Sequence, residues 1–236
     1  MGLLHDVRYS LRILRRSPGT AAAAVISLAL GIGANGAIYS WVRSILLEPL
    51  PGVARQEDIV VVANRSRSGA WRTLSYPDYV DLRDTCRTLE GLAVDSIVTV
   101  SLGASGEMQD AERLYGSLVS GNYFDVLRVG MTLGRGFTRA EEEAPGRAPV
   151  AVLSHALWQR RFASDVAIVG KTIQLNNKPY TVVGVASPDF YGAWSGLALD
   201  LWIPVVMQAD VMPGDLIHAR GNRWLQGLGR LGPGVT

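Results

Sequence analysis

The chain has 236 residues, of which 48% are hydrophobic and 19% charged, and its mean hydropathy is +0.16. This composition excludes a disordered chain, and a formal charge of +2 without a basic stripe argues against nucleic acid as a partner. The single cysteine, Cys86, excludes an intrachain disulfide and a cysteine metal cluster, and we predict no cofactor or metal site.

The first segment, residues 1–16, has the pattern of an amphipathic helix. Its leucines and valine fall on one face, and the adjoining arc carries four arginines: Arg8, Arg12, Arg15 and Arg16. Such a helix either lies in the membrane interface, where arginines meet anionic lipid headgroups, or packs on protein as an ordinary amphipathic helix. We predict the interfacial arrangement because an apolar run follows directly.

Residues 17–42 carry no charge, and apolar residues continue to position 47. A helix of this length spans roughly 39 Å, more than the hydrocarbon core of about 30 Å. Tyr39 and Trp41 lie at its far end, where aromatic rings favour the headgroup region. We therefore predict a transmembrane helix over residues 17–47, with the arginine-rich residues 1–16 on the cytoplasmic side and residues 48–236 across the membrane.

Two alternatives compete for this run. A basic start, an apolar stretch and small residues around Ala34–Ala37 are also typical of a cleavable signal peptide. Gly31, Gly33 and Gly36 match the G-x-G-x-x-G pattern of a dinucleotide-binding turn, which would make the protein an NAD(P)-binding enzyme. That pattern requires a short strand before the glycines, whereas a long uncharged run containing four consecutive alanines precedes them.

Small residues within the predicted span suggest helix packing. Ala29, Gly33 and Ala37 follow one another at intervals of four, which forms a stripe that another transmembrane helix can approach closely. Asn35 is polar within the span, and we expect it to face protein rather than lipid. These four residues are the predicted helix-packing site.

The remaining residues, 48–236, mix short strands and helices separated by tight turns. We predict a buried strand over 59–63, further strands over 97–104, 111–120, 149–154 and 200–207, a hairpin over 170–186, and helices near 77–85, 122–129 and 155–162. Ser154 is placed to cap the last helix, and Asn176-Asn177 to form the hairpin turn. This succession predicts an α+β domain with mostly antiparallel strands.

Catalytic motifs are missing from the sequence. The Gly170-Lys171-Thr172 triplet resembles the end of a phosphate-binding loop, but Asp165 stands where the earlier glycine is required. The acidic run Glu141–Glu143 is expected to be an exposed charged surface. We therefore predict that the chain is not an enzyme.

Four blocks of the sequence are similar to one family in the same order. They are RYSLRILRRSPGTAAAAVISLALGIGANGAIYS, VSGNYFDVLRVGMTLGRGFTRAEEE, APVAVLSHALWQRRF and GKTIQLNNKPYTVVGVASPDF. They resemble the start of MacB-like ABC transporter permeases, in particular the duplicated permeases of acidobacteria. The resemblance covers nearly the whole chain.

The resemblance implies a cytoplasmic amphipathic helix, one transmembrane helix and a periplasmic core domain, followed by three further transmembrane helices. It also implies an inner-membrane permease dimer, a separate ABC ATPase subunit that hydrolyses ATP, and transmission of movement to the periplasmic domain. Since the sequence stops at Thr236, before the further helices, we expect it to be the N-terminal part of such a permease. The alternative is a membrane-anchored or secreted periplasmic binding module that works without transport.

Overall fold

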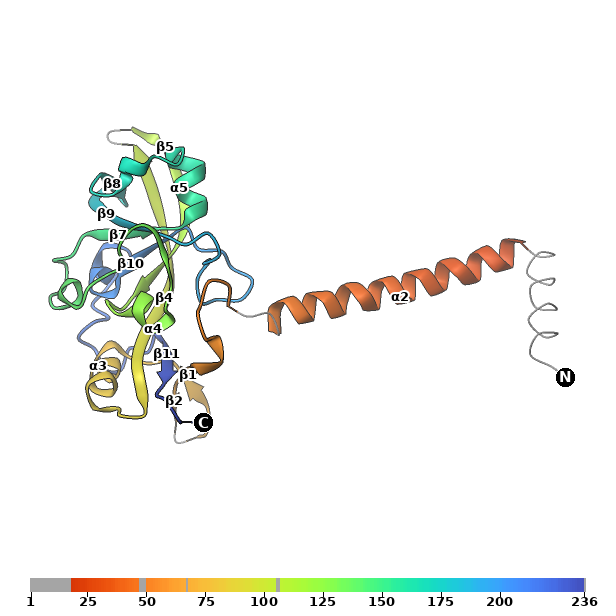
Figure 1. Cartoon of the computed structure of the whole chain (residues 1–236), viewed down its shortest axis with the longest axis horizontal. Helices are drawn as coiled ribbons and strands as arrows, with labels where there is room; N and C mark the ends of the chain where they lie inside the picture. Colours follow the sequence, from red (N-terminus) through yellow and green to blue (C-terminus); the bar gives the residue numbers. More distant parts are fainter. Residues whose placement is uncertain (1–17, 47–49, 67, 105–106, 236) are drawn as a thin grey trace. The chain divides into compact units, whose positions relative to one another are not determined.

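The computed structural model describes residues 18–46, 50–66, 68–104 and 107–235 (Figure 1). The chain divides into two compact units, Met1–Glu48 and Pro49–Thr236. The first contains one described helix, and the second is a sheet-rich domain. The amphipathic helix predicted over residues 1–16 lies outside the described residues.

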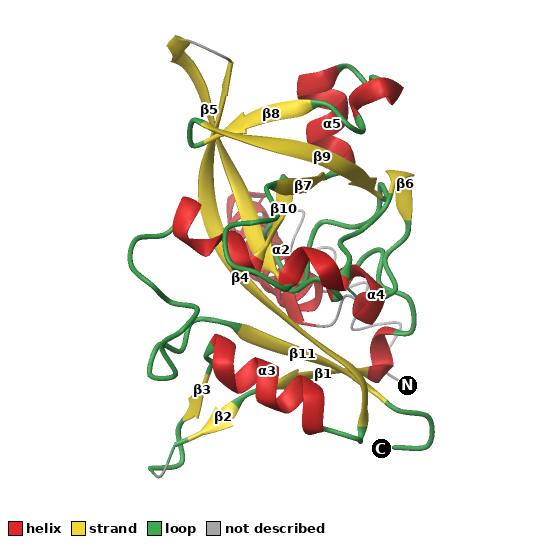
Figure 2. Cartoon of the chain, turned by 90° about the vertical axis from the view of Figure 1, so that its left-hand side faces the viewer, coloured by secondary structure: helices red, strands yellow, loops and turns green. Residues whose placement is uncertain are grey.

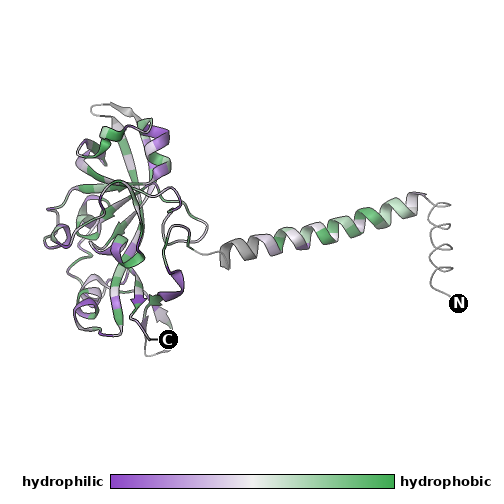
Figure 3. Ribbon diagram, in the orientation of Figure 1, coloured by the Kyte–Doolittle hydropathy of each residue, from purple (hydrophilic) through white to green (hydrophobic). Residues whose placement is uncertain are grey.

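Helix α2 runs from Pro18 to Leu46 and matches the helix predicted over residues 17–47. Pro18 occupies the first turn, where its missing N–H group leaves no intrahelical hydrogen bond unmade. The stretch Ala21–Ser40 is long and apolar enough to cross a membrane, with a mean hydropathy of 1.8 and no residue buried. Figure 3 shows this apolar character along the helix. Whether α2 crosses a membrane stays a prediction.

The domain contains eleven strands and three α-helices among the described residues, together with short 3-10 helices (η). In chain order they are η1 Gln56–Asp58, β1 Ile59–Val62, β2 Asn64–Arg65, β3 Trp71–Arg72, α3 Tyr76–Thr85, β4 Leu89–Ala104, β5 Glu107–Val119, α4 Tyr123–Leu127, β6 Met131–Gly134, η2 Arg139–Glu142, β7 Val150–Leu153, α5 His155–Phe162, η3 Val166–Ile168, β8 Thr172–Leu175, β9 Lys178–Ala186, β10 Leu201–Pro204, η4 Val205–Asp210 and β11 Gln226–Leu231.

Nine of the strands form one sheet in the order β1-β11-β4-β5-β10-β7-β9-β6, and β8 pairs with both β4 and β9. That double pairing closes β4, β5, β10, β7, β9 and β8 into a ring. Figure 2 shows the long strand β4, which runs from this ring to β11. Among the described strands only β5–β10 and β7–β9 pair in parallel. The predicted α+β fold with mostly antiparallel strands is therefore confirmed.

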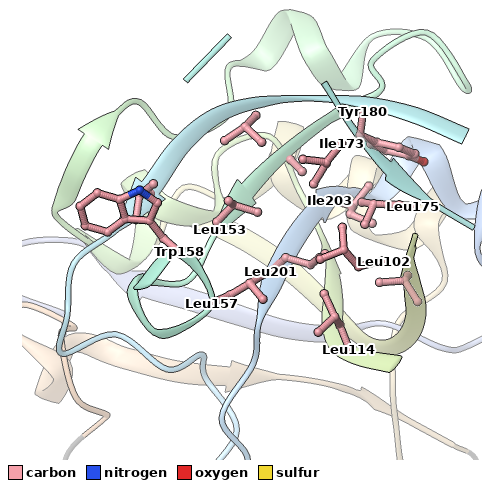
Figure 4. Close-up of a cluster of buried hydrophobic side chains, with 14 of the residues drawn as sticks. Leu102, Leu114, Leu153, Leu157, Trp158, Ile173, Leu175, Tyr180, Leu201 and Ile203 are labelled. Atoms are coloured by element: carbon pink, nitrogen blue, oxygen red, sulfur yellow. The ribbon is translucent and has the colours of Figure 1, made fainter. Parts of the chain in front are cut away.

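Three clusters of buried side chains stabilise the domain. The largest belongs to the ring strands and α5, and includes Leu114, Leu153 and Leu201, all with no exposed area (Figure 4). A second cluster packs aromatic rings of α4 against Phe190 and Trp202, and a third lies under α3. Every member of the three clusters lies in the domain, which therefore contains its own hydrophobic core.

Several local predictions hold. The Ser154 hydroxyl accepts a hydrogen bond from the Leu157 N–H at 3.1 Å and so caps α5. Asn176 and Asn177 have φ values of 49° and 61°, which is the left-handed pair that a tight hairpin turn requires. One expectation is wrong: the apolar run that forms β1 is an edge strand rather than a buried one, and Val61 is 67% exposed.

Candidate functional site

Helix α2 carries the predicted helix-packing residues Ala29, Gly33 and Ala37, all exposed. A Cβ atom added at Gly33 would meet nothing within 4 Å. At about 100° per residue, one arc of roughly 100° carries only small residues between positions 27 and 40. We call this arc the small-residue face, and its members are Ala29, Gly33, Gly36, Ala37 and Ser40. The face therefore continues past the predicted stripe to Ser40, and in the other direction it ends at the bulky Ile26.

Asn35 does not belong to this face. It lies about 160° around the helix axis from Gly33 at 100° per residue, on the side that carries Leu28 and Ile38. The two predicted contacts, a close helix neighbour for Gly33 and a protein neighbour for Asn35, therefore require different partners. Both stay predictions.

The predicted membrane-interface residues are only partly described. Tyr39 is 65% exposed on α2, and Trp41 belongs to the same helix but its side chain lies outside the described residues. Arg8, Arg12, Arg15 and Arg16 also lie outside the described residues. The arrangement of these arginines stays a prediction.

One buried arginine, Arg230, holds residues 54–58 to the rest of the domain. The sequence pattern did not identify it. Arg230 of β11 is 1% exposed. Its guanidinium donates to the carbonyl oxygens of Ala54 at 2.9 Å, Arg55 at 3.0 Å and Val126 at 2.6 Å. Asp58 lies 3.7 Å away and supplies the nearest carboxylate. These contacts tie residues 54–58 to β11 and to the end of α4.

Apolar packing also holds residues 50–53 to the rest of the domain. Gly52 has a φ of +76°, and a Cβ atom there would lie 2.8 Å from the Phe190 backbone nitrogen. Leu50 and Val53 pack against the aromatic cluster that contains Phe190 and Trp202. We call residues 50–58 with Arg230 and Phe190 the junction. Hydrogen bonds and apolar packing therefore both hold this segment to the rest of the domain.

The two ends of the domain meet at the junction. Strand β1 begins at Ile59, directly opposite Arg230 near the end of β11. The chain therefore arrives from α2 and leaves from β11 along neighbouring antiparallel strands. Residues 232–235 follow β11, and the Gly232 N–H donates a hydrogen bond to the Thr88 carbonyl at 3.0 Å.

Glu142 corrects the expectation of an exposed acidic run over residues 141–143. It is 6% exposed and accepts hydrogen bonds from the Gly121 N–H at 2.8 Å and the Tyr76 hydroxyl at 3.3 Å. The Arg83 guanidinium lies 3.6 Å away. Burial raises the pKa of the Glu142 carboxyl in spite of these partners. This carboxyl therefore joins η2, α3 and the turn before α4, a long-range role that the local charge pattern does not reveal.

A second buried carboxyl, Asp95, lies where β4 changes partners. Asp95 pairs with Gln226 of β11 on one side and Val119 of β5 on the other. It has no exposed area, and one carboxylate oxygen accepts a hydrogen bond from the Trp194 indole. The other oxygen has no partner among the described residues, and neither has the nearby Tyr123 hydroxyl. Burial raises the pKa of Asp95 to about 7.

The structure argues against the dinucleotide alternative. Gly31, Gly33 and Gly36 lie within the continuous helix α2, so no strand leads into them.

Among the described residues no group of three or more His, Cys, Asp or Glu side chains is arranged to hold a metal ion. The Ser154 hydroxyl, which precedes His155 in the sequence, accepts the capping hydrogen bond from the Leu157 N–H.

Residues 21–235 match the family described as the MacB-like periplasmic core domain. The chain belongs to this family. Its fold agrees with the periplasmic region of MacB from Actinobacillus actinomycetemcomitans, with a TM-score of 0.57, 18% identity and 78% of each chain covered. It also resembles the extracellular domain of the noncanonic ABC-type transporter YknZ from Gram-positive bacteria, with a TM-score of 0.51, 14% identity and coverage of 75% of this chain and 84% of that one.

Curated relatives place the family among ABC-type permeases. The macrolide export ATP-binding/permease proteins MacB of Shigella dysenteriae and Escherichia coli are each 34% identical to this chain over 110 residues. The matched stretch covers 47% of this chain but only 16% of each relative. The predicted resemblance is confirmed, and the chain carries a MacB-like periplasmic domain of an ABC-type permease family.

Proposed function

We propose that the chain is the N-terminal part of an ABC transporter permease subunit. In this proposal α2 anchors the domain in the inner membrane with its N-terminus in the cytoplasm, and the domain lies in the periplasm. A separate ABC ATPase supplies the energy, and a second permease copy or the remaining permease helices pack on the small-residue face of α2. The domain passes conformational change across the periplasm rather than catalysing a reaction.

The junction is the observation that carries this proposal. A movement of α2 along the membrane normal pulls on residues 50–58, which Arg230 and Phe190 hold to the domain. Because the chain leaves the domain beside the same point, a membrane segment on either end would act on one pair of strands, β1 and β11. A flexible linker would dissipate such a displacement, whereas a clamped segment transmits it.

Strand β4 supplies the path away from the junction. Its first part pairs with β11 from Leu89 to Asp95, and its second part pairs with β5 from Asp95 onward. It then reaches β8 at Leu102 and Gly103. At about 3.3 Å per residue this strand is roughly 50 Å long, so it links the junction to the far side of the ring.

The test uses the complete permease with its ATPase in proteoliposomes. A spin label at Gln159→Cys, exposed on α5 and remote from the junction, is introduced after Cys86→Ala. We expect ATP with vanadate to shift the distance between labels on two copies. Arg230→Met should abolish the shift while ATP hydrolysis continues, and Arg161→Met, an exposed arginine on α5, should leave the shift unchanged.

The second candidate is a membrane-anchored or secreted binding module without transport. It is supported by the observation that the domain has its own hydrophobic core within residues 50–235. If no ABC ATPase assembles with the permease, or if ATP leaves the label distances unchanged in the unaltered protein, this second function is favoured.

A further inference from the structure

The β2–β3 hairpin has an unusual charge. No Asp or Glu occurs between Asp58 and Asp78, whereas this stretch contains three arginines and one tryptophan. The sequence pattern alone indicates only a polar turn. In the structure Arg65 lies directly opposite Trp71 across the hairpin, and its guanidinium lies 5.6 Å from the centre of the Trp71 ring. Trp71 is 72% exposed.

The hairpin borders an open pocket of about 450 Å³. The residues that line it are Asn64, Arg65, Ser66, Ser68, Arg72 and Arg223. Neither Arg65 nor Arg72 has a carboxylate within ion-pair distance among the described residues, and Arg223 has only Asp78, at 3.9 Å. Among the described residues, the wall of the pocket thus has three guanidinium groups, two hydroxyls and no acidic side chain. That chemistry suits a phosphate group.

We propose that this hairpin binds the phosphate headgroups of anionic phospholipids at the membrane surface. The exposed Trp71 favours a lipid over a free anion, because indole rings partition into the headgroup region next to the phosphates that arginines bind. The chain connects the hairpin to the end of α2 through only 17 residues, 47–63, so the domain meets lipid at high effective concentration. The proposal rests on α2 being the membrane anchor.

The binding would restrain the domain at the bilayer. The hairpin extends from the end of β1 and from Leu74, which bridges to Leu225 just before β11. A second attachment beside the start of β11 would limit rotation about the junction, which holds the other end of the same two strands. A movement of α2 would then displace the ring, because the domain could not simply rotate about the junction.

The test places the full chain in nanodiscs of phosphatidylcholine, with or without phosphatidylglycerol, and measures amide hydrogen exchange of residues 64–72. We expect phosphatidylglycerol to slow this exchange. In Arg65→Gln/Arg72→Gln the equilibrium between bound and free hairpin should fall roughly 30-fold, at about 1 kcal/mol for each arginine near the surface, and remove the protection. The matched control Arg147→Gln/Arg161→Gln removes the same charge from two exposed arginines elsewhere and should retain it. Unchanged exchange in β4 and β5 shows that each variant is folded.

Each other outcome overturns the proposal. Equal loss of this protection in both double variants means that net charge alone attracts the domain to the anionic bilayer. Protection by inorganic phosphate in phosphatidylcholine discs means that the pocket takes a free anion. No effect of phosphatidylglycerol on a chain that is incorporated into the discs refutes lipid binding while leaving the anchor intact. Failure of the chain to enter the discs refutes the proposed function itself.

Discussion

Asp95→Asn tests whether a buried carboxyl at the joint of the sheet makes the domain sensitive to pH. The Asp95 side chain has no solvent exposure and accepts a hydrogen bond from the Trp194 indole. The shift of its pKa has no contribution from a charged group, and the Tyr123 phenol lies nearby. Desolvation therefore dominates and raises the pKa of Asp95 from 3.8 to about 7.

The direction of the pH effect on stability depends on whether the folded or the unfolded state binds the proton of the Asp95 carboxyl more tightly. Because the folded-state pKa lies above the unfolded value, the contribution of Asp95 is most favourable below about pH 4 and is lost as the pH rises to about 7. A difference of about three pKa units, at about 1.4 kcal/mol for each unit, sets an upper limit of about 4 kcal/mol. Asparagine has nearly the same shape but never ionises.

Urea unfolding of residues 50–236, followed by tryptophan fluorescence, measures the effect. The unaltered domain and Asp95→Asn should have similar free energies of unfolding near pH 4. The variant should become more stable than the unaltered domain by up to about 4 kcal/mol near pH 8. Asp125→Asn, which removes an exposed carboxyl from α4, is the matched control and should show no such divergence. A constant difference between pH 4 and pH 8, or a less stable variant at pH 8, refutes the reasoning.

Two further predictions concern the membrane unit. Gly33→Leu should weaken association of α2 with another membrane helix by about 1 kcal/mol or less in a helix-association assay. The control Gly31→Leu, on the other side of the helix, should leave this association unchanged. Equal effects of both variants would contradict a single packing face. In a background without the native cysteine, Gln159→Cys on α5 should react with an impermeant maleimide in intact spheroplasts, and Ser10→Cys only after permeabilisation. The reverse pattern would place the domain in the cytoplasm.

Elements with strong local signals could be predicted from the sequence. An uncharged run longer than a bilayer is thick predicts α2, and two adjacent asparagines before a β-rich stretch predict the β8–β9 turn. Ser154 follows an apolar strand and precedes a helical pattern, so its capping role could also be predicted. In each case neighbouring residues determine the conformation.

The junction and the buried carboxyls could not be predicted in this way. Arg230 and Glu142 are buried by contacts with residues far away in the sequence, such as Ala54 for the first and Tyr76 for the second. A charged residue surrounded by turn residues or other acids looks exposed when only its neighbours are known. The closure of the sheet is equally nonlocal, because it depends on β8 pairing with β4, a strand that lies far earlier in the chain.

The position of Asp95 connects its ionisation to the proposed transmission. Strand β4 is regularly paired with β5 from Asp95 to Leu102, and the register shifts in its two long pairings lie near its ends. Asp95 is the one residue of β4 whose backbone pairs with both β5 and β11, so in the proposed function a force transmitted along β4 would pass through it. A charge buried there without an ionic partner weakens packing at this joint. Coupling through the domain should therefore be strongest at pH values where Asp95 is protonated, and Asp95→Asn should extend strong coupling to higher pH in the label-distance experiment.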